Sequence, residues 1–325
     1  DERGGNFVAG VYPMMLHETC FFLAIDLDQA NWRDDALAVL ETCRRLEAPA
    51  VLERSRSGNG AHVWFFFEAA VPASIARRLG SYALTETMER RPEIGLDSYD
   101  RLFPNQDTLP KGGFGNLIAL PLQMGPRDAG NSVFVDDEFE PHADQWALLS
   151  SIERISSATL EELVSKADGA GRIIDVRVAD DAEHWRMPPS RSHGAPRLIG
   201  NLPAKLELIL ADQIYIPKKH LPPALRNRLT RLAAFQNPEF YKAQSMRLPT
   251  WGKPRIISCA EDHPQHLALP RGCFEDIQRL LDDLHIEIDT RDERTIGEPI
   301  NLKFQGDLRP SQNTAVRRLL AHDIG

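Results

Sequence analysis

Apolar residues in the first half of the chain follow two spacings, one typical of strands and the other of amphipathic helices. Five apolar residues at 21–25 come directly before Asp26 and Asp28. This run predicts a buried strand, and because alternate strand residues share a face, both aspartates should point the same way. Apolar positions at helical spacing predict helices over residues 32–46 and 72–88.

Between these two helices the pattern predicts a β-hairpin. Its strands, residues 50–53 and 61–67, are joined by residues 54–60, a basic turn rich in glycine and serine. His62 and Trp64 should share one face of the second strand. Glycines let backbone amides approach an anion and arginines add positive charge, so the turn is a candidate phosphate-binding site. A plain hairpin turn would show the same pattern.

Residues 91–125 predict a long connection that is rich in glycine and proline. Connections of this length inside a domain are usually functional, and this one carries the acids Asp97, Asp100 and Asp107. The apolar pattern then predicts strands at residues 116–123 and 132–136 and a helical region at 143–166.

The second half of the chain begins with a predicted linker, residues 167–200, which are polar and rich in proline, serine and glycine. It separates a catalytic core, residues 1–166, from a mixed α/β accessory region, residues 201–306. The elements expected beyond the linker are helices at 203–211, 222–235, 274–284 and 310–321 and strands at 255–259 and 286–289.

The bulk composition excludes several classes of protein. With 325 residues, 42% apolar and 26% charged, the chain resembles an ordinary soluble protein long enough for two domains. No apolar run approaches the roughly 20 residues needed to span a bilayer, and no signal peptide is evident, although Asp1 is not a natural start. The four cysteines form no Cys-x-x-Cys pair, so we expect reduced thiols, a cytoplasmic location and no membrane partner.

A net charge of −9 argues against a protein that coats nucleic acid, but it does not exclude a local basic groove. Residues 216–255 hold one acid among many basic residues, with aromatic residues interleaved. Because basic side chains bind phosphates and aromatic rings stack on bases, this segment is a candidate nucleic-acid interface. A solvated basic face packed on aromatic core residues would give the same pattern. The candidate contacts are Arg226, Arg228, Arg231 and Lys242.

The acidic pair Asp26 and Asp28 is a candidate metal site. Two carboxylates at the end of a buried strand repel one another unless a cation compensates. Mg²⁺ prefers oxygen ligands, and two metal ions held by carboxylates can activate a hydroxyl nucleophile and stabilise a leaving pyrophosphate. Asp97 leads the candidates for a third acid, with Asp100 and Asp107 as alternatives. An Asp-x-Asp that only caps a turn is the competing interpretation.

The order of these elements resembles the archaeo-eukaryotic primase superfamily, which includes the primase-polymerases. Its signature is a strand ending in Asp-x-Asp/Glu, then a turn and strand of the Ser-Gly-x-Gly-x-His type, then a further acid. Here these are Asp26 and Asp28, residues 57–62, and Asp97. Residues 53–60 and 100–107 look like the primase part of bacterial primase–helicase proteins of TOTE-type conflict systems.

The resemblance implies an α+β fold in which a small α/β lobe and an RRM-like antiparallel lobe meet at the acids. It implies that Asp26, Asp28 and Asp97 are catalytic and hold two Mg²⁺ or Mn²⁺ ions. The implied reaction is that of a DNA primase-polymerase, which joins nucleoside triphosphates on a single-stranded DNA template and primer. The residues expected to bind the incoming nucleotide are Arg54, Arg56, Ser57, Asn59, Gly60, His62, Lys111 and Asn116.

In the proteins that the chain resembles, a superfamily 2 helicase follows the primase. Residues 308–312 are similar to the glutamine motif that precedes such a helicase. Residues 307–325 are therefore expected to begin a helicase domain that is truncated here and continues in the full-length protein. Two other functions suit the same residues: a non-catalytic nucleic-acid or nucleotide-binding module, and a metal-dependent nuclease.

Overall fold

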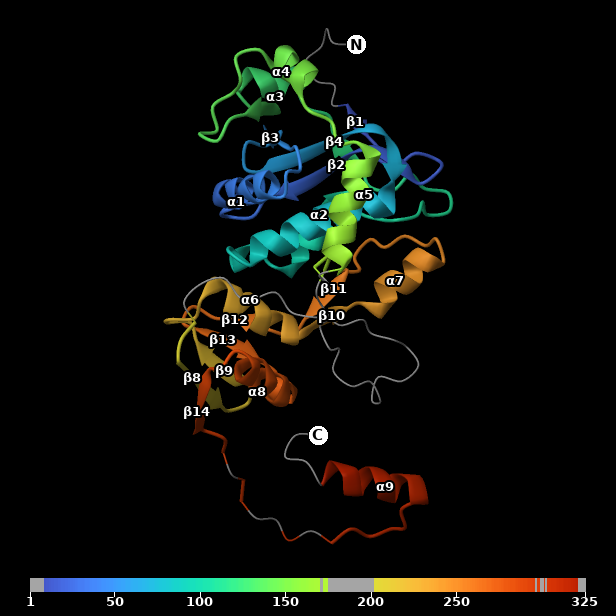
Figure 1. Ribbon diagram of the computed structural model, residues 1–325. Helices are drawn as coiled ribbons and strands as arrows, with labels where there is room; N and C mark the ends of the chain where they lie inside the picture. Colours follow the sequence, from blue (N-terminus) through green and yellow to red (C-terminus); the bar gives the residue numbers. More distant parts are fainter. Residues whose placement is uncertain are drawn as a thin grey trace. The chain divides into compact units, whose positions relative to one another are not determined.

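The computed structural model describes residues 9–169, 172–174, 202–295, 297–298, 301 and 303–320 (Figure 1). The chain divides into two compact units. Unit 1 contains residues 1–199 together with 235–257, and unit 2 contains residues 200–234 and 258–325. The chain therefore returns to unit 1 after it has entered unit 2. Residues 175–200 of the predicted linker lie outside the described residues.

Unit 1 is built on a five-stranded sheet in which all neighbouring strands are antiparallel. The predicted hairpin is confirmed, because β3 pairs with β4 across the glycine-rich turn. In sheet order the strands are β5 (Leu102–Phe103), β2 (Thr19–Leu27), β4 (Ala61–Pro72), β3 (Val51–Arg54) and β7 (Val133–Val135).

One face of this sheet is covered by helices. Helices α1 (Trp32–Arg45) and α2 (Ala73–Met88) pack against the strands and against each other, and α5 (Ser157–Gly169) packs on α2 (Figure 1). Leu23 of β2 is fully buried there. Gly80 of α2 approaches it so closely that a Cβ would lie 2.8 Å from Leu23 Cδ2. Glycine at this position lets the helix sit directly on the strand.

The opposite face carries a second buried cluster, made of Ala24, Trp64, Ile118 and Phe134. It is covered in part by the short antiparallel pair β1 (Gly10–Val11) and β6 (Ile118–Ala119) and by α4 (Gln145–Ser151). Because Asp26 follows Ala24 by two positions on β2, its side chain belongs to this face, at the end of the strand. The remaining short helices are η1 (Pro92–Ile94), η2 (Leu96–Asp100) and α3 (Met124–Asp128).

Two predicted elements of unit 1 are interrupted. The expected strand at 116–123 is reduced to β6, because Leu122, with φ of 64°, turns the chain after Pro121. The expected helical region at 143–166 contains α4 and α5 with an extended segment between them. That segment runs beside β4, where the backbone N–H of Ile155 donates to the carbonyl of Phe66 at 2.8 Å.

We call residues 235–257 the strap, because this segment belongs to unit 1 although it lies beyond the predicted linker. It contains most of β10 (Ala234–Gln236) and β11 (Ile256–Ser258), which pair with each other, and the helix α7 (Pro238–Ser245). Asn237 caps α7 by accepting a hydrogen bond from the backbone N–H of Glu239, and Pro238 occupies the first turn.

Unit 2 contains a mixed five-stranded sheet in which β8 and β14 are parallel and the other pairs are antiparallel. Its helices, among the described residues, are α6 (Pro223–Leu232), η3 (Arg271–Cys273), α8 (Phe274–Asp283) and α9 (Pro310–Leu319). In sheet order the strands are β12 (Glu261–Asp262), β13 (His266–Leu269), β9 (Ile214–Pro217), β8 (Lys205–Leu210) and β14 (Glu287–Asp292). With the antiparallel sheet of unit 1, this arrangement confirms the predicted α+β class.

The helix expected at residues 203–211 is wrong, because residues 205–210 form the strand β8. Leu206 and Leu208 are buried at alternate positions, and this period of two indicates a strand more strongly than Pro203 indicates a helix start. The helix expected at 310–321 is α9 (Pro310–Leu319), and residues 321–325 lie outside the described residues. Across the described ranges, no helix combines the length and apolar character needed to cross a membrane.

Candidate active site

Three polar side chains lie side by side across the central strands of the unit 1 sheet. Asp26 of β2 is paired in register with His62 of β4, and His62 is paired with Glu53 of β3. His62 Nδ1 lies 2.9 Å from Glu53 Oε2, and His62 Nε2 lies 3.6 Å from Asp26 Oδ1. The imidazole therefore stands between two carboxylates. We call these three residues the carboxylate–histidine row.

Glu53 was not among the predicted site residues. Its side chain is buried, and Oε2 accepts hydrogen bonds from His62 Nδ1 and, at 2.7 Å, from Trp64 Nε1. A buried carboxylate is stable only when it is paired and hydrogen-bonded, and these two donors meet that need. The shared acceptor confirms that His62 and Trp64 lie on one face. The sequence did hold a signal for this role. Glu53 is a glutamate within an apolar strand, and the hairpin places it opposite His62 on the next strand.

The electrostatics of the row favour a charged imidazole. Burial lowers the pKa of His62, but the hydrogen bond to Glu53 and the charges of Glu53, Asp26 and Asp28 raise it, and the net shift is upward. Burial raises the pKa of Asp26, His62 lowers it, Asp28 raises it again, and the net shift is also upward. Burial is the largest cause of the Asp26 shift, so the carboxylate of Asp26 is held in a partly desolvated position beside a charged imidazole.

The second strand-end carboxylate, Asp28, is paired with a cation of the chain itself. The Arg101 guanidinium contacts Asp28 Oδ1 through Nη1, and its Nε lies 4.0 Å from Asp97 Oδ2. The carboxylates of Asp28 and Asp97 are half exposed or more, with 50% and 62% of their side-chain surface accessible. Two of the three predicted metal ligands are thus gathered around one guanidinium at the surface.

The other two candidates for a third acid face the strap. Asp100 accepts a hydrogen bond from the backbone N–H of Arg255 at 2.8 Å. Asp107 pairs with Arg77 at 2.5 Å and accepts a hydrogen bond from Gln244 at 2.9 Å. Burial raises the pKa of Asp100, and the N–H of Arg255 opposes that shift. Both acids therefore hold the strap in place.

The glycine-rich turn adjoins the acids. A Cβ on Gly60 would lie 3.3 Å from Asp28 Cβ, so glycine permits close contact between the turn and the end of β2. Gly58 has φ of 76°, a left-handed conformation that glycine adopts without strain. Ser57 Oγ accepts a hydrogen bond from the backbone N–H of Asn59 at 3.2 Å, which shapes the turn. The predicted phosphate-binding turn is therefore next to a predicted metal ligand.

The two arginines of this turn differ in their surroundings. Arg54 donates to the backbone carbonyls of Gly130, at 2.9 Å, and of Phe139. It therefore connects the hairpin to the loops that follow it, and its guanidinium is already engaged by these carbonyls. Arg56 is exposed at the tip of the turn, where an anion can reach it.

Asn116 and Lys111 belong to the long connection after Arg101. Asn116 Nδ2 donates to the carbonyl of Leu102 at 3.1 Å, and its Oδ1 accepts from the backbone N–H of Asn105 at 3.3 Å. Through these two hydrogen bonds, Asn116 ties the end of the loop that begins at Asn105 to its start. Lys111 lies in that loop with its side chain exposed, and its backbone N–H donates to the carbonyl of Arg247 in the strap at 2.9 Å.

Comparison with known families identifies this arrangement. The family described as TOTE conflict system, Archaeo-Eukaryotic Primase domain, matches residues 3–163, which include the row, the turn and the acid pair. Residues 3–163 are an archaeo-eukaryotic primase domain of the TOTE type. A search among curated proteins gave no match. The primase domain ends before the strap begins, so the strap is an addition to it within unit 1.

The four residues predicted to contact nucleic acid all lie beyond the primase domain. The side chains of Arg228 and Arg231 in α6 are buried, with 9% and 5% of their surface exposed. Little of either side chain is therefore accessible at the surface, and their contact with nucleic acid stays a prediction. Arg226 is paired with Asp262 at 3.0 Å. Lys242, in α7 of the strap, is exposed as expected.

The donor chemistry of the primase domain suits a hard divalent ion, because carboxylate oxygens are the ligands that Mg²⁺ and Mn²⁺ prefer. Among the residues that the structure describes, no three His, Cys, Asp or Glu side chains converge closely enough to hold an ion. The Arg101 guanidinium lies against both Asp28 and Asp97. This guanidinium would compete with a metal ion for Oδ1 of Asp28.

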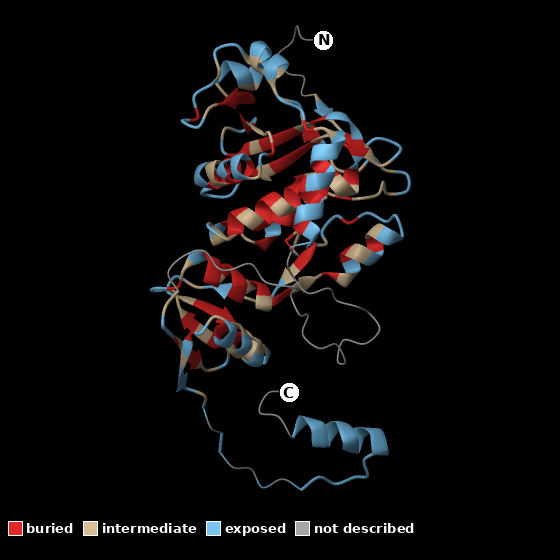
Figure 2. Cartoon of the chain, viewed as in Figure 1, coloured by how far each residue is buried: buried red, intermediate tan, exposed pale blue. Residues whose placement is uncertain are grey.

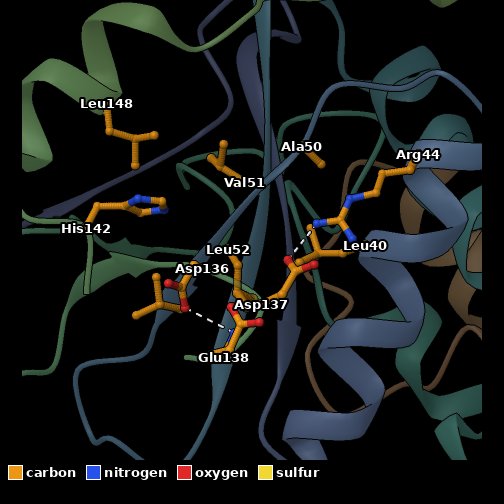
Figure 3. A pocket seen from close by; sticks show the side chains of 11 residues that line it. Leu40, Arg44, Ala50, Val51, Leu52, Asp136, Asp137, Glu138, His142 and Leu148 are labelled. Carbon is orange, nitrogen blue, oxygen red and sulfur yellow. Dashed lines mark hydrogen bonds and ion pairs between the residues drawn. The ribbon is translucent and has the colours of Figure 1, made fainter. Parts of the chain in front are cut away.

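A separate pocket of about 460 Å³ opens beside β3 and α1. Figure 3 shows its apolar floor and the Arg44–Asp137 ion pair, 2.6 Å long, at its rim. None of the predicted site residues lines it. It is lined by Leu40, Arg44, Ala50, Val51, Leu52, Val135, Asp136, Asp137, Glu138, His142 and Leu148.

Proposed function

We propose that the chain is a template-dependent nucleotidyltransferase, a primase-polymerase that joins nucleotides on single-stranded DNA. The observation that carries this proposal is the carboxylate–histidine row beside the glycine-rich turn, within an archaeo-eukaryotic primase domain. Acids that suit divalent ions and a turn that suits phosphates are the two parts that nucleotide transfer needs.

In this proposal Asp26, Asp28 and Asp97 hold two Mg²⁺ or Mn²⁺ ions. The bound ions supply Lewis acidity and neutralise negative charge on the reacting phosphates. The 3′-hydroxyl of the primer attacks the α-phosphate of the incoming nucleotide, a new phosphodiester bond forms, and pyrophosphate leaves. Asp97 is our choice for the third acid, because Asp100 and Asp107 are held by the strap.

The chain's own residues bind and orient the triphosphate. Glu53 fixes the His62 ring through Nδ1 and favours its charged form, so Nε2 can donate a hydrogen bond to a phosphate oxygen. The glycine-rich turn is our candidate for contact with a second phosphate. The N–H groups of Gly58 and Asn59 already donate within the turn, to the carbonyl of Ser55 and to Ser57 Oγ, so this contact would need them to be released. Arg56 and Lys111 are exposed and add positive charge without a change of fold.

Primer extension tests the proposal directly. The full chain is incubated with a single-stranded template, an annealed labelled primer, nucleotides and Mn²⁺, and the products are separated by length. We expect products longer than the primer, with a sequence set by the template, and no products when EDTA removes the metal. Absence of both extension and de novo priming with Mg²⁺ and Mn²⁺, for ribo- and deoxyribonucleotides alike, would overturn the proposal.

The pairing of Arg101 with Asp28 favours a second candidate, a nucleic-acid or nucleotide-binding module without catalysis. An arginine that permanently neutralises Asp28 would keep metal ions out of the site. The same incubation distinguishes the candidates, because such a module would retain nucleotide or DNA in a binding assay and leave the primer length unchanged. Shortened strands would instead indicate a nuclease that uses the same acids.

A further inference from the structure

The loop of the strap between α7 and β11 presents an unusually exposed tryptophan. Trp251 is 95% exposed, whereas tryptophan is normally buried for most of its surface. Met246 and Leu248 on the same loop are also exposed. Apolar side chains that gather on one exposed loop mark an interaction site.

A second loop, residues 105–117 of the primase domain, lies directly against this one. Gln106 donates to Thr250 Oγ1, and the backbone N–H of Lys111 donates to the carbonyl of Arg247 at 2.9 Å. This second loop also carries an exposed aromatic ring, Phe114. Figure 2 colours exposed residues pale blue and buried ones, such as most of the central strands of unit 1, red. The Phe114 ring packs 5.2 Å from that of Tyr12, which is exposed as well.

Positive charge accompanies these rings. The strap holds four basic residues and one acid, Glu239. Lys111 and Lys242 are exposed, and Arg247 is half exposed although it pairs with Glu18 at 2.5 Å. Exposed aromatic rings among basic side chains are the combination that binds single-stranded nucleic acid, because every base offers a face for stacking. A duplex keeps its bases stacked inside and offers no such contact.

We propose that the surface formed by Trp251, Phe114, Lys111 and Arg247 binds the single-stranded template. This inference rests on the proposed function and names the place where that function takes its template. Arg101 contacts Asp28 and begins the connection that continues into the loop of Lys111 and Phe114. Part of the proposed surface therefore comes directly after candidate-site residues in the sequence.

The test measures the affinity of the full chain for a labelled oligothymidylate, in EDTA and without nucleotides, so that catalysis plays no part. Trp251→Ala should raise Kd about 5- to 150-fold, the range for loss of one base–aromatic stack. Trp251→Phe should restore most of the affinity, and Trp251→Leu should not. Trp146→Ala is the matched control, since Trp146 is a 65% exposed tryptophan on α4.

The basic residues have a separate signature. Lys111→Ala and Arg247→Ala should each reduce the dependence of log Kd on log salt concentration by about 0.7, the value for one phosphate of a single strand. The proposal fails if Trp251→Ala binds the oligonucleotide as tightly as the wild type and the Trp146→Ala control do. It also fails if Trp251→Leu binds like Trp251→Phe, because an apolar docking surface for a protein would not require a ring.

The DNA-binding measurements and the primer-extension assay can fail separately. If the wild type binds the oligonucleotide through Trp251 but extends no primer, the surface stands and the proposed catalysis fails. If the wild type extends primers and Trp251→Ala binds DNA normally, the catalysis stands and the surface fails.

Discussion

The two halves of the candidate site are built differently. Asp26, His62 and Glu53 lie in register across three strands, with Glu53 buried and accepting two hydrogen bonds. Asp28 and Asp97 instead lie at the surface and share the guanidinium of Arg101. The first half is fixed by the sheet before any ligand arrives. The second half can exchange its cation without disturbing the core.

Under the proposed function this difference would give the two halves different tasks. A fixed histidine, held in orientation by a buried carboxylate, would be preorganised to bind a phosphate and would lose little entropy when it does so. Exposed carboxylates paired with an arginine would suit metal ions that arrive with the nucleotide. The proposed site would then combine a rigid phosphate contact with acids that, together with Asp26, are completed only when substrate binds.

The largest loss of activity is expected when an acid of either half is removed, Asp26 in the row or Asp28 at the surface. Asp26→Ala and Asp28→Ala should each reduce nucleotide incorporation at least about a thousandfold, because a metal ligand supports several kcal/mol of charge stabilisation in the transition state. The measurement is the rate of primer extension with Mn²⁺, and circular dichroism checks that each variant is folded. Incorporation at the wild-type rate in either variant would show that metal ions are not held there.

Glu53→Gln separates the rigid half from the exposed half. We expect it to lower the free energy of unfolding by about 1 to 3 kcal/mol, since a buried hydrogen bond to a charged group is weakened. The measurement is urea denaturation, with Asp97→Asn as the control in the exposed half, where a change within about 0.5 kcal/mol is expected. Equal effects in the two variants would remove the distinction between the halves.

Arg101→Ala tests whether the exposed half exchanges its cation. The variant should bind Mn²⁺ several-fold more tightly, because the ion no longer competes with the guanidinium for Asp28, and its stability should change by less than about 1 kcal/mol. Electron paramagnetic resonance of free Mn²⁺ measures the affinity without any activity assay. Weaker binding of Mn²⁺ would mean that Arg101 helps to hold the acids in place for the metal.

The smallest expected effect is on the alkylation of cysteines, one of which lies on β2, the strand that carries Asp26. Burial raises the pKa of Cys20 on this strand, and of Cys43 on α1, to about 12. A raised pKa leaves very little thiolate at mildly alkaline pH, and neither side chain is accessible, so both should resist alkylation. Mass spectrometry after brief treatment with iodoacetamide should find Cys259, which is exposed, modified first. Early labelling of Cys20 would show that the strand opens in solution.

Local patterns in the sequence predicted part of the structure around the candidate site. The hairpin and the shared face of His62 and Trp64 follow from strand alternation and from the residues of one turn. Glu53 was not predicted as a site residue, because its role depends on His62, its partner in the neighbouring strand β4. The strand β8 was mistaken for a helix because Pro203 was weighed above the alternation of Leu206 and Leu208.

The strap could not be predicted, for a physical reason. Its contacts join residues far apart in the chain, such as Asp100 and Arg255, and no periodicity within either segment records them. The basic and aromatic composition of residues 216–255 did indicate an interface, but composition does not tell which side chains are buried. Arg228 and Arg231 proved to be buried, whereas Trp251 and Lys242 are exposed.

The position of the strap in the chain has a consequence for synthesis on the ribosome. Asp100 finds its hydrogen-bond partner 155 residues later, and Gln244 reaches Asp107 across 137 residues. Since chains fold from the amino terminus as they are made, the sheet with Asp26 and His62 can form early. The contacts of Asp100 and Asp107 with the strap form only later. A nascent chain can therefore build the carboxylate–histidine row well before the strap fixes the connection that follows Asp97.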